Sequence, residues 1–460
     1  MKHDLERWGS PTMINNRFVA LAAVSLAAVV AATSGAHAGA FAVREQSATA
    51  QGMSFAGAAS GSGGISSMFW NPATVTMKPG WNSEFHASFI IPESTIDPAP
   101  GTSPFLAFPP GSGNFIGSGD IGKEALVPAS YTSYQLSDNV WLGLSTSAPF
   151  GLVTKPEPVW SGQIYARTSK VFSLNLNPIV GVKLTDWLSV AAGPAIQYFD
   201  VRLRSASSFL ATAPTTTLEG DDVGVGATAG ALLTLPTNTQ IGVGFRSAIR
   251  HELWGEIESQ SPRREVPIEA KLTLPETVTV GLSQAFTPYF RVHAGFEWTN
   301  WSRLSSPDVI GPVGLITELV LNYKDGYFYS GGAEYDLSDR WTIRAGVAYE
   351  DSPITTENRT PRLPDNDRVW ASLGATYKWN DRLSFDVAYT HIFVSDSKIN
   401  IGEGRDDLVR AAIPGVGAAV SLPFVADAES KVDIISAALK YRWDTPVAPA
   451  VPVAPIVRKY

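Results

Sequence analysis

The most constraining feature of this chain is an alternation of side-chain character with a period of two, repeated in short segments from Trp81 onward. The segments 290–301, 341–350 and 383–393 show it most clearly, each with one apolar and one polar face. Such alternation is typical of a strand that is buried on one side only. Because no long stretch follows the 3.6-residue period of a helix, the chain is predicted to be all-β.

Fourteen such strands are predicted, and the links between them alternate in length. The strands are expected to start near Trp81, Val127, Val140, Val171, Trp187, Val223, Gln240, Ala270, Phe290, Tyr327, Trp341, Arg368, Leu383 and Val432. Tight turns, such as 337–340 and 380–382, alternate with long links, such as 302–326 and 395–431. This rhythm is typical of an outer-membrane barrel with short periplasmic turns. Because closure pairs every backbone group inside a bilayer, residues 81–443 are predicted to form a 14-stranded antiparallel transmembrane β-barrel.

Tryptophans are concentrated at the short-turn end of the predicted strands, where an aromatic girdle is expected. Six share this position: Trp81, Trp141, Trp187, Trp341, Trp379 and Trp443. Their placement agrees with short turns on the periplasmic side of the membrane.

The N-terminal region is interpreted as a targeting segment. An apolar run at 18–32 follows Arg17 and precedes the small-residue site Ala36-His37-Ala38, so residues 1–38 are predicted to be a secretory signal peptide. Met13 is an alternative start of the chain.

Two further segments flank the barrel. Residues 39–80 are rich in Gly, Ala and Ser and are predicted to form an N-terminal plug, or hatch, because wall side chains alone cannot fill so wide a lumen. A disordered periplasmic lead is the alternative interpretation of this segment. Residues 444–460 carry prolines at a period of three and are predicted to form an extended periplasmic tail.

Composition and motifs argue against several other functions. The chain has no cysteine, and no H-E-x-x-H or G-x-S-x-G motif is present, so no catalytic residue, metal site or cofactor is predicted. The formal net charge of −8 argues against a nucleic-acid partner. A lipase-like enzyme of the outer membrane remains an alternative.

A series of short motifs resembles a known family of transporters. The plug motifs are Glu45-Gln46-Ser47 and Asn71-Pro72-Ala73, and the barrel motifs include Leu274-Pro275-Glu276, Trp298-x-x-Trp301-Ser302, Trp341-Thr342-x-Arg344-x-Gly346, Asn358-Arg359 and Pro364-Asp365-x-Asp367-Arg368-x-Trp370. In this order and spacing they resemble the FadL/TodX family of outer-membrane transporters for long-chain fatty acids and other hydrophobic compounds. The resemblance extends from about Gly39 to Trp443.

The resemblance implies passive transport of a fatty acid or similar compound. A ligand would enter at the outer loops, occupy an internal apolar pocket and leave sideways through the barrel wall after the hatch rearranges. By this likeness Phe41 and Lys324 are predicted to contact the ligand, Arg202 is a candidate for its carboxylate, and Asn71, Pro72 and Ala73 are predicted to belong to the hatch or gate. An ion pair between Lys324 and Asp325 at the outer rim is the alternative for that lysine.

Some features depart from this family pattern. The outer links 204–222 and 258–269 are short for a surface capture groove, which the apolar stretches in 92–126 and 411–426 could supply instead. Alternative functions are uptake of aromatic hydrocarbons, a structural or adhesion barrel, and a porin for polar solutes. We expect a monomer in the bacterial outer membrane, with a hydrophobic small molecule, outer-membrane lipid and lipopolysaccharide as its partners.

Overall fold

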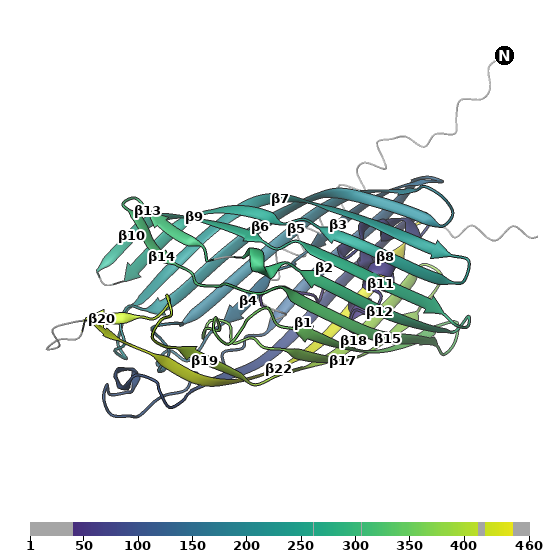
Figure 1. The fold of residues 1–460 in the computed structure, drawn as a ribbon. Helices are drawn as coiled ribbons and strands as arrows, with labels where there is room; N and C mark the ends of the chain where they lie inside the picture. The colour runs from purple at the N-terminus through teal and green to yellow at the C-terminus, as the bar shows by residue number, and fades with distance from the viewer. Residues whose placement is uncertain (1–39, 261, 305, 413–418, 445–460) are drawn as a thin grey trace, which may run out of the picture.

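The strands of the computed structural model close into a single antiparallel barrel (Figure 1). The structure describes residues 40–260, 262–304, 306–412 and 419–444. The predicted signal peptide lies outside the described residues, and so does the proline-rich tail beyond Asp444. No helix in the described part of the chain is long and apolar enough to cross a membrane.

The barrel wall has fourteen strand positions. In order around the wall they are β1 (Trp81–Pro98), β2 (Ala125–Ser137), β3 (Val140–Ser147) with β4 (Gly151–Thr154), β5 (Thr168–Lys183), β6 (Leu188–Ala206), β7 (Thr215–Leu235), β8 (Thr239–Arg246) with β9 (Ile249–Gln260), β10 (Arg263–Leu274) with β11 (Thr277–Ala285), β12 (Phe290–Thr299), β15 (Gly326–Asp336), β16 (Trp341–Asp351), β17 (Arg368–Lys378), β18 (Leu383–Val394) and β22 (Phe424–Arg442). The wall closes where β1 pairs with β22, from Asn82 opposite Arg442 to Pro98 opposite Ala426. The predicted all-β barrel of fourteen antiparallel strands is therefore confirmed.

The long links carry five shorter strands. These are β13 (Asp308–Gly311), β14 (Gly314–Glu318), β19 (Ser397–Ile401), β20 (Arg410–Ala412) and β21 (Ala419–Ser421). β13 pairs with β14 and also with the wall strand β10, while β19 pairs with β22. Residues 411–426, predicted to be an apolar loop, thus contain β20, β21 and the start of β22, and residues 413–418 lie outside the described part.

Strands that follow a short turn start within one residue of the prediction, whereas several strands that follow a long link start well before the predicted residue. β1, β3, β12, β16, β17 and β18 begin at the predicted residue. β7, β10 and β22 begin at Thr215, Arg263 and Phe424, well before the predicted Val223, Ala270 and Val432. These strands extend past the apolar zone, where runs of polar residues such as 215–217 and 263–265 give no apolar face to detect.

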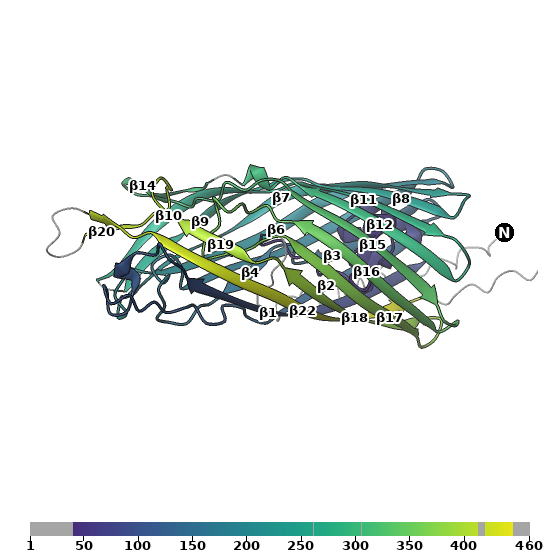
Figure 2. The same ribbon diagram turned by 60° about the horizontal axis from the view of Figure 1, so that its bottom comes forward.

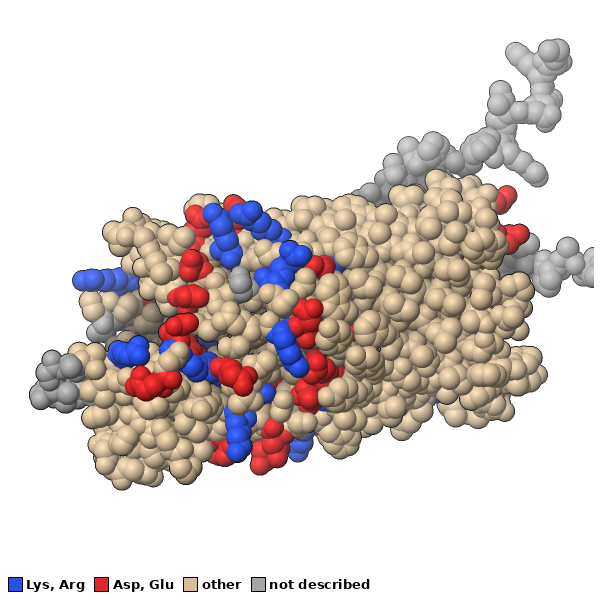
Figure 3. All heavy atoms as spheres, viewed as in Figure 1, with Lys and Arg blue, Asp and Glu red and all other residues tan. Residues whose placement is uncertain are grey.

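The outer surface separates into an apolar and a charged zone (Figure 3). On the face shown, Lys, Arg, Asp and Glu gather over the half that carries the long links, and a zone without them lies toward the short turns. Large apolar side chains are exposed on the wall, among them Val243, Phe245, Leu282, Val347, Leu373 and Val387. An apolar belt of this kind is what a barrel presents to the hydrocarbon of a membrane.

The expected tryptophan girdle is formed only in part. Trp187, Trp341, Trp379 and Trp443 are exposed, but Trp141 is buried. The alternation along β3 turns Trp141 into the lumen, where its Nε1 donates a hydrogen bond to the Lys78 carbonyl at 3.0 Å. The inclusion of Trp141 in the girdle was therefore wrong.

Residues 40–80, here called the inner segment, run through the barrel interior (Figures 1 and 2). The segment contains α2 (Ala48–Gln51) and three short 3₁₀ helices, η1 (Ala58–Ser60), η2 (Gly64–Phe69) and η3 (Pro72–Met77). Most of its side chains are buried. Its helices contact wall strands on several sides, including β2, β6, β11, β17 and β18.

Wall glycines let the backbone of the inner segment approach closely. A Cβ on Gly346 would lie 2.2 Å from the Met53 carbonyl carbon, and one on Gly244 would lie 1.8 Å from the Trp70 oxygen. No side chain fits into such contacts, because real Cβ atoms do not approach other atoms below about 3 Å. The tight fit between wall and inner segment therefore depends on glycine at these positions.

We expect Gly346→Ala to displace the inner segment around Met53, at an overpacking cost of about 1–3 kcal/mol. Hydrogen exchange of residues 50–57 should become faster, and single-channel recordings in planar bilayers should show more open events. Gly331→Ala in the neighbouring strand is the matched control, since a Cβ there meets nothing within 4 Å. Equal behaviour of the two variants would contradict the proposed close contact.

Candidate functional site

An apolar cavity of about 450 Å³ lies inside the barrel toward the long links. Its walls come from β4–β7 and β9–β10, from residues 317–323 after β13, and from residues 360–363 and 406–409 of two outer links. Its side chains are mainly aliphatic and aromatic, including Phe41, Leu152, Val171, Phe199, Leu253, Leu272, Val309 and Tyr323. A concave apolar site with few polar groups is the usual form of a small-molecule pocket.

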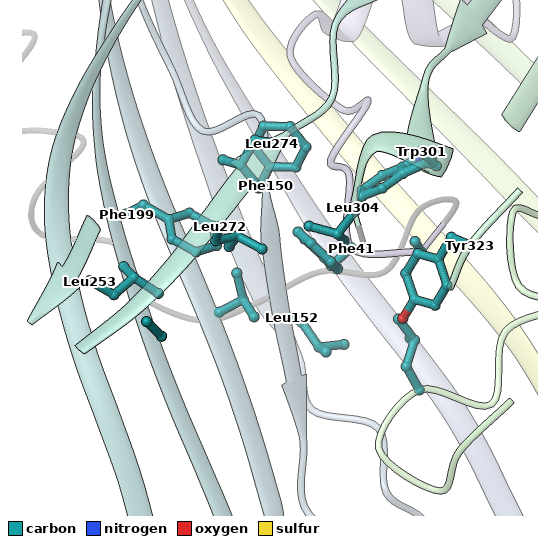
Figure 4. Close-up of a cluster of buried hydrophobic side chains, with 14 of the residues drawn as sticks. Phe41, Phe150, Leu152, Phe199, Leu253, Leu272, Leu274, Trp301, Leu304 and Tyr323 are labelled. Atoms are coloured by element: carbon teal, nitrogen blue, oxygen red, sulfur yellow. The ribbon is translucent and has the colours of Figure 1, made fainter. Parts of the chain in front are cut away.

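Phe41 and Tyr323 line this cavity and belong to a cluster of buried aromatic rings that also includes Phe150 and Trp301 (Figure 4). The Phe41 ring lies 5.0 Å from that of Trp301 and 5.8 Å from that of Phe150, measured between centroids. Trp301 also contacts Tyr323, at 6.2 Å. The inner segment thus contributes Phe41 to the cavity, where the sequence predicted a ligand contact. Phe150, Trp301 and Tyr323 had not been predicted as site residues, because each is separated from Phe41 in sequence.

The two cations predicted to meet a ligand carboxylate both have acidic partners. Lys324 Nζ lies 2.8 Å from Asp351 Oδ1, and Arg202 forms an ion pair with Glu219. Neither cation lines the cavity. The alternative partner of Lys324 was wrong, since Asp325 instead accepts hydrogen bonds from Trp298 and Ser302. The ligand roles of Lys324 and Arg202 stay predictions.

The motif Asn71-Pro72-Ala73 fastens the inner segment to the wall. Asn71 precedes η3, and its Oδ1 accepts from the Ala73 N–H at 3.0 Å, with Pro72 at the first helical position. Its Nδ2 donates to the Ala59 carbonyl at 2.7 Å and to the Ala231 carbonyl of β7 at 2.9 Å. None of the three residues lines the cavity. Their predicted role as a gate is not tested by this geometry.

The barrel wall is interrupted between β3 and β4. β2 pairs with β3 from Ser130 onward, and within the described residues Ala125–Ala129 have no strand partner on that side. β4 pairs with β5 along its length, and on its other edge only its last residue, Thr154, forms a bridge, with Gly122 in the link before β2. The wall therefore lacks one row of backbone hydrogen bonds next to the cavity.

The inner segment supplies backbone partners at this interruption. The Val43 N–H donates to the Pro149 carbonyl at 2.8 Å, and the Gly151 N–H donates to the Phe41 carbonyl at 2.9 Å. The Gln46 side-chain amide accepts from the Ala148 N–H at 3.1 Å and donates to its carbonyl at 2.9 Å. The inner segment, which contributes Phe41 to the cavity, thus also supplies hydrogen-bond partners at the interrupted wall.

Buried charges hold the start of the inner segment. Arg44 pairs with Glu297 at 2.6 Å and with Glu350 at 3.2 Å, and its guanidinium lies 3.8 Å from the centre of the Phe328 ring. The neighbouring Glu45 is fully buried, and neither of its carboxylate oxygens has a hydrogen-bond partner. Burial raises the pKa of Glu45 to about 7, opposed by the nearby positive charge of Arg44.

No group of three or more His, Cys, Asp or Glu in the described residues has the geometry to hold a metal ion. The lining of the cavity is mainly apolar, and its charged members are Glu219, Glu318, Arg362, Asp406 and Asp407.

The raised pKa of Glu45 predicts a pH-dependent fit of the inner segment. Because the folded form binds a proton that the displaced form releases above about pH 4.5, the docked state should lose stability as pH rises from about 4.5 to about 7. The amide hydrogen-exchange rates of residues 43–50 should rise with pH in the wild type relative to Glu45→Gln. Comparing the two proteins at the same pH cancels the intrinsic pH dependence of amide exchange. A ratio of the two exchange rates that does not change with pH would contradict this prediction.

Comparison with known proteins agrees with this architecture. The family described as outer membrane protein transport protein (OMPP1/FadL/TodX) matches residues 29–443. A long-chain fatty acid transport protein of Salmonella typhi is 26% identical over 415 residues, which cover 83% of this chain and 93% of that protein.

Solved structures share the fold. A FadL homologue of Pseudomonas aeruginosa superposes with a TM-score of 0.76 at 22% identity, covering 88% of this chain and all of that one. The toluene transporter TbuX of Ralstonia pickettii gives 0.62 at 15% identity, covering 87% of this chain and all of that one. The relatives are transport proteins, which sets the enzyme alternative aside. The chain therefore belongs to the OMPP1/FadL/TodX family of outer-membrane transport proteins.

Proposed function

We propose that this protein carries long-chain fatty acids or similar hydrophobic compounds passively across the outer membrane, through the internal cavity and sideways into the membrane. The observation that carries the proposal is the apolar cavity of about 450 Å³ that ends on Phe41 of the inner segment. An acyl chain in a water-filled pore would lose about 0.8 kcal/mol for each exposed CH₂. An apolar cavity avoids that cost, whereas a porin for polar solutes does not need an apolar cavity.

The size of the cavity supports an elongated ligand. An apolar cavity of about 150 Å³ is enough for one benzene molecule. The cavity here has about three times that volume, so a single-ring compound would leave much of it empty. The Salmonella relative is named for long-chain fatty acids, which agrees with this preference.

Sideways release is supported by the position of the wall interruption. Phe41 lines the cavity, and Phe41, Val43 and Gln46 all form hydrogen bonds with residues 148–151 at the β3–β4 junction. A shift of the inner segment would therefore move Phe41 from the cavity and expose the unpaired edge of β2 in one step. We place the exit between β2 and β4 for this reason.

Aromatic hydrocarbons are a second candidate class. The rings of Phe41 and Tyr323 line the cavity and can contact an aromatic ligand. TbuX, which shares the fold, is named as a toluene transporter. Competition of toluene against labelled oleate for the purified protein would separate the two classes.

We further propose that one chain is the transport unit and that lipopolysaccharide contacts the charged zone of the barrel. The cavity, its aromatic end and the wall interruption all come from one chain. Exposed pairs such as Lys431–Glu93 and Arg250–Glu252 lie in the outer half of their strands. Lysine and arginine there can pair with lipid phosphates.

Locking the inner segment with a disulfide should stop transport, because the cavity end could no longer move. The chain has no native cysteine, and Ser54 Oγ lies 2.7 Å from Ser372 Oγ of β17, so S54C/S372C can form a bond. Under oxidation we expect uptake of labelled oleate by expressing cells to fall about tenfold or more, and a reducing agent should restore it.

The matched control joins two wall strands and leaves the inner segment free. Ser83 of β1 and Thr132 of β2 are register partners with side-chain oxygens 3.1 Å apart, so S83C/T132C tests oxidation alone. Full uptake by oxidised S54C/S372C would refute movement of the inner segment. No uptake of oleate or toluene by the reduced proteins would favour a structural or adhesion barrel.

A further inference from the structure

One cation lines the cavity, and it has no acidic partner. Arg362, in the link between β16 and β17, is the single Lys or Arg among the cavity-lining residues that the structure describes. No carboxylate of a described residue lies within 4.0 Å of its guanidinium. A charge placed against apolar side chains is costly unless something pairs with it.

The hydrogen bonds of Arg362 use only one end of the guanidinium. Nη1 donates to the Arg204 carbonyl at 3.1 Å and to Ser169 Oγ at 3.4 Å. Nε and Nη2, which carry three of the five N–H donors, have no partner in the described residues. The residue is partly exposed, and it lines the cavity. The free donors form the fork that matches the two oxygens of a carboxylate.

Acidic residues of the cavity rim do not satisfy this fork. Glu219 pairs with Arg202, and Asp407 Oδ2 lies 2.6 Å from Arg405 Nη2. Glu318 and Asp406 are exposed to solvent. Burial lowers the pKa of Arg362 to about 10, so the side chain stays charged at neutral pH.

The link that carries Arg362 is held firmly. Arg359 Nε donates to the Asp365 carbonyl at 2.7 Å, and its Nη1 donates to the Lys398 carbonyl at 3.0 Å. Thr154 of β4 donates to the Arg362 carbonyl at 3.0 Å. The position of the guanidinium is therefore set before any ligand arrives, which lowers the entropy cost of binding.

We propose that Arg362 binds the carboxylate of a fatty-acid ligand through Nε and Nη2, while the acyl chain fills the apolar cavity. This inference rests on the proposed function and deepens it, since it selects anionic amphiphiles over neutral hydrocarbons. It assigns the head group to a residue other than Lys324 or Arg202, whose cations already have acidic partners.

The test compares an acid with its matching alcohol. Dodecanoate and dodecan-1-ol share a chain length, and only the first has a carboxylate, so their affinities for the protein in lipid nanodiscs at pH 8 isolate the head group. Arg362→Gln should weaken dodecanoate binding about 10- to 100-fold, because charge-assisted hydrogen bonds are lost, and should leave dodecan-1-ol nearly unchanged. Arg362→Lys, which keeps the charge without the fork, should give an intermediate loss for the acid.

Two matched variants serve as controls. K170Q and K271Q each remove a barrel cation that has an acidic partner and does not line the cavity, and both should bind dodecanoate like the wild type. K324Q and R202Q are measured beside them to test the other two candidate cations. Retained binding of dodecan-1-ol by Arg362→Gln shows that its cavity is intact. Equal losses for acid and alcohol would mean that Arg362 only supports the link, and an unchanged acid affinity would mean that it does not contact the head group; either overturns the inference.

The outcomes also separate the inference from the proposed function. A wild-type protein that binds both compounds equally would keep hydrophobic transport and overturn the role of Arg362. An acid-specific loss in K324Q or R202Q, without one in Arg362→Gln, would move the head group to the other cation. A wild-type protein that binds neither compound and does not take up oleate would overturn the proposed function itself.

Discussion

Pairing of backbone groups is the constraint on which the rest of this structure depends. At membrane depth an unpaired N–H or C=O has no water to bind, so the wall must close on itself, as β1 and β22 do. The wall fails this requirement at the β3–β4 junction, and there the inner segment supplies the missing partners through Val43 and Gln46. The interrupted wall and the segment inside it are therefore one hydrogen-bonded unit. A displacement of the inner segment would therefore break hydrogen bonds of the wall at this junction.

Besides apolar contacts, small polar groups form part of the contact between the inner segment and the wall. Hydroxyl pairs such as Ser54–Ser372 and Ser60–Ser283 join the two, and glycines bring the backbones together. The net value of a hydrogen bond is only about 0.5–1.5 kcal/mol, because water replaces the lost partner when the contact opens. When an apolar contact of the same area opens, water does not replace the lost interaction in this way. The hydroxyl pairs therefore contribute little to the cost of displacing the segment, and most of that cost lies in its apolar contacts and in the ion pairs of Arg44.

The sequence predicted the wall better than the site, and the difference has a physical origin. Strand periodicity is local, so the barrel and most strand starts could be read from it, except where β7, β10 and β22 leave the membrane. Ion pairs between residues that are distant in sequence leave no pattern in the local sequence. Lys324 was given its sequence neighbour Asp325 as an alternative partner, whereas the fold brings Asp351 to it.

Arg362 was missed for the same reason. It lies between two apolar neighbours, Pro361 and Leu363, in a link without periodicity, and nothing in its surroundings marks it as unpaired. Only the packed structure shows which arginines have acidic partners. Phe41, by contrast, could be predicted from its family resemblance, and the structure places it at the cavity. Its role in transport remains part of the proposal.

The link between β16 and β17 joins the head-group site to the start of the inner segment. Asp365, three residues beyond Arg362, accepts a hydrogen bond from the Ala40 N–H at 3.0 Å and pairs with Arg368. A ligand can shift an equilibrium only as far as it binds one state better than the other. A carboxylate bound to Arg362 would contact the same short link that holds Ala40 through Asp365. A difference in ligand affinity between the two states of the inner segment could therefore arise within this link. In the proposed mechanism, capture of the head group and release of the inner segment would thus be coupled through one loop.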